Sequence, residues 1–96
     1  MTDKIRVLVF ATDDYWIVQG VDVDICAQSW RSEEHAKQRF DDTFNLEVSE
    51  RNGRQVLKFL MEKPPPEFAE RWRAALEAPK PNCRAMHYDI YAGTFY

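Results

Sequence analysis

The chain has 96 residues, enough for one domain with a single modest core and too few for two. Apolar residues make up 45% of the sequence and aromatic residues 14%, which excludes an intrinsically disordered chain. No apolar run is long enough to span a membrane and the first residues lack a signal-peptide pattern, so we expect a soluble cytoplasmic protein without membrane contacts.

The formal net charge of −3 conceals a difference between the two halves of the chain. Residues 1–50 contain 5 Lys and Arg against 11 Asp and Glu, whereas residues 51–96 contain 8 against 5. A surface that binds phosphates needs clustered cations, so the first half is poorly suited to direct contact with nucleic acid. An acidic half is suited to a basic protein partner.

Three apolar runs at the start of the chain predict a meander of antiparallel strands. They span Ile5 to Ala11, Tyr15 to Gln19, and Val21 to about Gln28. Polar and apolar residues alternate in the third run, which places one face toward a core. Its inward residues would be Val21, Val23, Ile25 and Ala27. The first run is apolar on both faces, so this strand is either central and covered twice or exposes a contact surface.

A capped amphipathic helix follows the third strand. Ser32 is a good N-cap, and Glu33 and Glu34 in the first turn meet the positive end of the helix dipole. One stripe of the helix is apolar: Ala36, Phe40, Phe44 and Val48. We expect this helix to lie across the inner face of the meander and to end near Arg51, before Asn52 and Gly53.

The second half of the chain predicts a connector, a shorter helix and a final strand. Residues 54–63 fit either a strand or a helical turn, and three prolines from Pro64 to Pro66 then force an extended elbow. A helix is expected from Glu67 to about Ala78. Arg84 to Tyr96 alternates like a strand, and its aromatic end would either dock on the core or belong to an interface.

These elements predict an α+β fold of order β-β-β-α-α-β. A sheet of three to four antiparallel strands would carry one long helix on a face, with the shorter helix after the Pro-rich elbow. We expect residues 1–96 to form a single domain, in which residues 1–53 are a β-β-β-α unit, 54–66 a connector, 67–78 a helix and 84–96 the C-terminal strand.

Few residues suggest catalysis. Asp22 and Asp24 could belong to a two-metal nuclease, but such a site also requires a carboxylate on the first strand, which has none. Cys26 and Cys83 are too far apart in sequence for a metal site, so we expect two free thiols. There is no glycine-rich phosphate loop. We therefore predict no enzyme, no metal and no cofactor.

The first half of the chain resembles the HicB antitoxin-like family. The likeness is carried by three segments: Tyr15 to Val18, Asp24 to Gln28, and Ser32 to Glu34 with Ala36 and Phe40. The resemblance implies a partial RNase H fold. It also implies a protein that binds and occludes a basic, RNA-cleaving toxin of the HicA type. The chain departs from the family by an extra residue within Ser29 to Arg31 and by lacking the DNA-binding tail, so we expect no direct DNA contact.

The combined prediction is a stoichiometric protein-binding module with a basic partner. Its expected contact residues are acidic or apolar and come from the first 30 residues: Leu8, Phe10, Asp13, Asp14, Asp22, Asp24 and Trp30. Trp30 could equally fold back over the start of the helix. Two other functions stay open, a phage or mobile-element inhibitor of the anti-CRISPR or DNA-mimic type and the metal nuclease. A homodimer is also possible.

Overall fold

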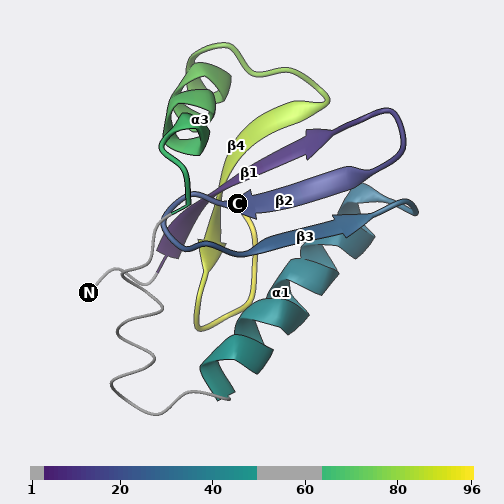
Figure 1. Cartoon of the computed structure of the whole chain (residues 1–96), viewed down its shortest axis with the longest axis vertical. Coiled ribbons are helices and arrows are strands. Elements are labelled where there is room, and N and C mark those ends of the chain that lie inside the picture. Colours follow the sequence, from purple (N-terminus) through teal and green to yellow (C-terminus); the bar gives the residue numbers. More distant parts are fainter. Residues whose placement is uncertain (1–3, 50–63) are drawn as a thin grey trace.

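The computed structural model describes residues 4–49 and 64–96 (Figure 1). It confirms an α+β fold with the element order β-β-β-α-α-β. The elements are β1 (Lys4–Ala11), β2 (Trp16–Gly20), β3 (Cys26–Ser29), α1 (Glu33–Ser49), α3 (Glu67–Glu77) and β4 (Cys83–Asp89). The predicted helix end near Asn52 and the undecided segment 54–63 lie outside the described residues.

The four strands form one antiparallel sheet in the order β3-β2-β1-β4. β1 is therefore central, and the last strand of the chain pairs with the first. α1 packs on one face of the sheet and α3 on the other, over β1 and β4 (Figure 1). Of the two possibilities for the apolar first strand, the structure shows the central strand that is covered on both sides.

The larger core lies between the sheet and α1. The predicted helix stripe is confirmed, because Ala36, Phe40 and Phe44 are buried and Val48 packs against them. Ser32 caps the helix, since its Oγ accepts the backbone N–H of His35 at 3.0 Å. The smaller core lies under α3. It consists of Leu8, Val21, Trp72 and Ala75.

The third strand is shorter than expected, because residues 21–25 form a tight turn. The N–H of Gly20 donates to the carbonyl of Ile25 at 2.8 Å, which closes this turn. Only glycine fits there, since a Cβ on Gly20 would lie 2.3 Å from the carbonyl oxygen of Val23. Val21 consequently packs under α3, whereas Val23 and Ile25 face α1, so the predicted single face is wrong for Val21.

The last strand also ends earlier than expected, at Asp89. The Asp89 carboxylate accepts the backbone N–H groups of Tyr91 and Ala92, and the chain reverses through Gly93, whose φ is 69°. Phe95 then packs on the larger core beside Tyr88. The aromatic C-terminal residues therefore return along β4 instead of extending it.

Among the described residues, no helix combines the length and the apolar composition that crossing a membrane requires.

Candidate protein-interaction site

The four aspartates of the predicted site do not form one surface. Asp13 and Asp14 lie in the turn before β2, whereas Asp22 and Asp24 follow its end. The two connections lie at opposite ends of β2 (Figure 1), and a five-residue strand separates them by roughly 15 Å. The four aspartates predicted as contact residues are therefore not brought together in one place.

Asp22 is also neutralised within the chain. Its Oδ1 lies 2.7 Å from Nη2 of Arg6, and its Oδ2 accepts the backbone N–H of Arg6 at 2.7 Å. The hydrogen bonds to Asp22 raise the pKa of the Arg6 guanidinium, although its partial burial acts in the opposite direction. Asp24 stays exposed. Of the four aspartates, Asp13, Asp14 and Asp24 therefore present charge to solvent.

Leu8 and Phe10 were expected to offer apolar contact, but α3 covers this part of the sheet. The side chain of Leu8 is fully buried in the smaller core and cannot reach a partner. Phe10 is half-buried, with the Arg71 guanidinium carbon 4.4 Å from its ring centroid. The sequence showed an apolar outer face on β1 but not which element would cover it.

Trp30 is the strongest remaining candidate. Trp30 is 77% exposed, so its side chain does not fold back over α1, and neighbouring Tyr15 is 40% exposed. We name Asp13, Asp14, Tyr15 and Trp30 the Trp30 patch. These residues line a shallow hollow of about 190 Å³. The other residues lining it are Ala11, Thr12, Trp16 and Arg31.

The backbone that carries the Trp30 patch is well fixed. On one side, the N–H of Thr12 donates to the carbonyl of Tyr15 at 2.8 Å and closes the β1–β2 turn. On the other side, Ser29 Oγ accepts the backbone N–H of Arg31 at 3.0 Å and lies 2.6 Å from Nδ1 of His35. Hydrogen bonds thus fix the backbone both in the β1–β2 turn and in the connection from β3 to α1, from which the exposed indole projects. A fixed backbone lowers the entropic cost of using Trp30 in binding.

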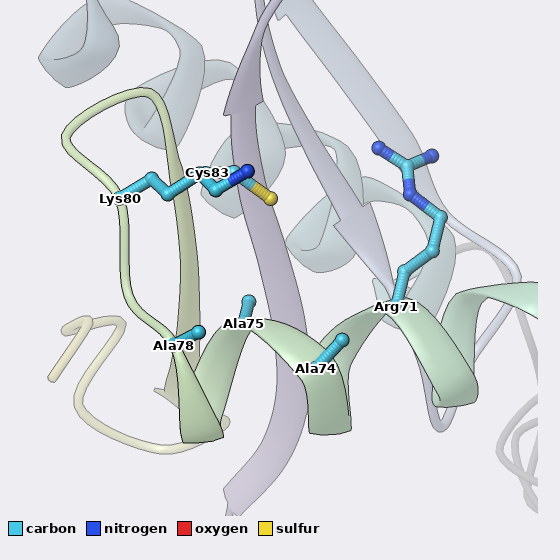
Figure 2. A pocket seen from close by; sticks show the side chains of 6 residues that line it. All are labelled: Arg71, Ala74, Ala75, Ala78, Lys80 and Cys83. Atoms are coloured by element: carbon cyan, nitrogen blue, oxygen red, sulfur yellow. The ribbon is translucent and has the colours of Figure 1, made fainter.

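A second hollow, of about 290 Å³, lies beside α3 (Figure 2). Its lining is mostly apolar with two cations: Arg71, Ala74, Ala75, Ala78, Lys80 and Cys83. Sequence reasoning missed it, because its walls come from the small side chains of a helix whose position on the sheet was unknown. Its two cations do not suit a basic partner.

The cysteines and the metal-ligating side chains are the two features of the described residues that bear on catalysis. Cys26 and Cys83 are free thiols, as expected. Cys26 is exposed as a residue, but partial desolvation of its thiol, reinforced by the charge of Asp24, raises the thiol pKa, which disfavours the reactive thiolate. Within residues 4–49 and 64–96, no three or more His, Cys, Asp and Glu side chains are grouped to hold a metal.

Fold and site together define a small α+β domain with α1 on one face of its sheet, α3 on the other over β1 and β4, and the exposed Trp30 patch on its described surface. Comparisons with known proteins add no family: no family model, no curated protein and no solved structure matches the chain. The resemblance to HicB antitoxins stays a prediction from the residues quoted above.

Proposed function

We propose that this chain is a stoichiometric protein-binding module of the HicB-antitoxin kind, which binds and occludes a basic, RNA-cleaving toxin. The observation that supports it is Trp30, a large aromatic residue that is 77% exposed beside Asp13 and Asp14. Tryptophan, with tyrosine and arginine, is enriched among the residues that dominate the energy of protein interfaces.

The charges around Trp30 support a basic partner. Asp13 and Asp14 are both exposed and outnumber Arg31, the one cation among the described residues that line the same hollow. Cationic side chains on a partner would meet these carboxylates while an apolar group packs on the indole. The same contacts would cover the cations that a ribonuclease uses to hold RNA phosphates.

The direct test begins with affinity capture from the source cell, with the tagged protein as bait. We expect one dominant basic protein among those retained. After purification, that protein should cleave RNA on its own, and a molar equivalent of this chain should suppress the cleavage. Retention of a basic protein without RNA-cleaving activity would contradict the antitoxin proposal, and retention of no basic protein would contradict protein binding as well.

A further inference from the structure

The two outer strands of the sheet, β4 and β3, differ in how far other described residues cover their outward backbone groups. In an antiparallel ladder, every second residue of an outer strand turns its N–H and C=O groups away from the sheet. Unless these groups are covered, they can pair with another strand. Within residues 4–49 and 64–96, the edge of β4 is covered and the edge of β3 is open.

On β4, the chain covers most of its own edge. His87 exchanges two backbone hydrogen bonds with Tyr96, at 2.6 and 2.9 Å, and the N–H of Asp89 donates to Thr94 at 2.8 Å. Cys83 likewise exchanges bonds with Lys80. The returning C-terminal residues and the turn before β4 therefore occupy this edge.

On β3, the register shows which groups face outward. The N–H of Gly20 donates to Ile25, and hydrogen-bonded pairs recur at every second position toward Ser29. Cys26 and Gln28 occupy the alternate positions, so their backbone N–H and C=O groups point away from β2. Both residues are exposed, and no described residue donates a hydrogen bond to these groups or accepts one from them.

The ends of this open edge are acidic. Exposed Asp24 lies two residues before the start of β3, and the Trp30 patch lies at its other end. A segment paired along β3 would thus have a carboxylate near one end, and two carboxylates and the indole near the other. Basic side chains on the segment match this distribution of charge.

We propose that the edge of β3 receives an extended, basic segment of the protein partner, which adds to the sheet as a further strand. This inference rests on the proposed protein-binding function and specifies how the partner is held. Backbone groups of Cys26 and Gln28 supply the pairing, and Trp30 packs on an apolar side chain of the segment. The preference for a basic segment comes from three exposed carboxylates, those of Asp13, Asp14 and Asp24.

A second copy of this chain suits the edge less well. Antiparallel pairing of two β3 strands about a two-fold axis would place Asp24 of each copy near Asp13 and Asp14 of the other. Arg31 offsets only part of this repulsion. A basic segment brings opposite charges to the same positions.

The test uses a defined probe, a blocked octapeptide in which lysine alternates with valine. On binding, the amide protons of Cys26 and Gln28 should exchange with solvent about tenfold more slowly, because they become hydrogen-bonded. A peptide of the same sequence with every backbone amide N-methylated should not bind, because no N–H group remains on either edge to pair with β3. Unchanged exchange at Cys26 and Gln28 would overturn the proposal.

Gln28→Pro tests the edge from the side of the protein. The substitution removes an N–H that points away from β2, so the sheet can keep its own hydrogen bonds. We expect about tenfold weaker peptide binding, equal to about 1.4 kcal/mol. Gln28→Thr keeps the N–H and is the matched control, with binding expected within about twofold of wild type. Equal binding by both variants would also overturn the proposal.

Two further outcomes separate the hypotheses. If the captured basic protein is lost on Trp30→Ala but kept on Gln28→Pro, protein binding stands and strand addition is wrong. If the free protein sediments as a dimer that Gln28→Pro dissociates, the occupant is a second copy and the proposed partner segment is wrong.

Discussion

Arg6 and Asp22 form a two-point ion pair that ties the central strand β1 to the turn after β2. The guanidinium contacts the carboxylate through Nη2 at 2.7 Å and through Nε at 3.1 Å. The other carboxylate oxygen also accepts the Arg6 backbone N–H. This carboxylate therefore stabilises the turn, which distinguishes it from the exposed aspartates near Trp30.

Asp22→Asn should destabilise the fold by about 1 kcal/mol without weakening partner binding. The pair is partly exposed, which limits its energetic contribution. Urea unfolding measures the stability, and titration with the captured protein measures the affinity. Asp24→Asn is the control, because Asp24 is exposed and its loss should leave stability within about 0.5 kcal/mol. If Asp22→Asn bound the partner more weakly, Asp22 would have to be a contact residue of the interface, contrary to this prediction.

Tyr88 connects β4 to α1 through a hydrogen bond from its hydroxyl to Asp41, at 2.6 Å. Burial, reinforced by Asp41, raises the pKa of Tyr88 far above the ordinary value. Because the folded pKa is raised, this tyrosine contributes stability that is present below pH about 10 and is lost as the pH rises further.

Tyr88→Phe should therefore cost about 1 kcal/mol of unfolding free energy at pH 8, and less at pH 11. Urea unfolding of wild type and Tyr88→Phe at both pH values measures this. The difference in their unfolding free energies reports on Tyr88 alone, because the other tyrosines are present in both proteins. A stability difference that stays constant between pH 8 and pH 11 would contradict a raised pKa for this hydroxyl.

Glu33 links the start of α1 to β4, because it pairs with Arg84 and with Lys37, the latter at 2.9 Å. Burial alone would raise the pKa of Glu33, but the two cations outweigh it and hold the pKa below its ordinary value. Its contribution to stability is consequently present above pH about 4.5 and is lost as the pH falls through the folded pKa.

Glu33→Gln should lower the unfolding free energy by about 1 kcal/mol at pH 7, and the difference should shrink toward pH 3. Glu34→Gln is the matched control, because the Glu34 side chain is 83% exposed and should matter little. Denaturant unfolding at several pH values follows both variants. An equal effect of the two substitutions at pH 7 would argue against the pairing with Arg84.

Local signals were sufficient to predict most of the fold. The cap at Ser32 and the stripe through Phe40 both depend on neighbouring residues, and both are confirmed. Long-range packing was not predictable in the same way. The alternation from Val21 to Ala27 looks like one strand, yet Gly20 allows a turn that sends Val21 to the opposite core.

The candidate site was predictable only in part. Trp30 was identified because it lies in a short link between a strand and a capped helix, where burial is least expected. Leu8 was wrongly included, since the sequence does not show that α3 crosses β1. Asp14 precedes β2 and Asp24 follows it, so the strand separates them. The predicted meander already implied this separation, but a count of charges in the first half of the chain does not show it.

The central claim is that partner binding runs through Trp30, and the affinity of Trp30→Ala for the captured basic protein tests it most directly. Tyr91→Ala is the matched control, because Tyr91 is 70% exposed and lies in the turn after β4. We expect Trp30→Ala to weaken binding about 30-fold, or about 2 kcal/mol, with unfolding free energy unchanged and with Tyr91→Ala behaving like wild type. Full affinity in Trp30→Ala would contradict the account.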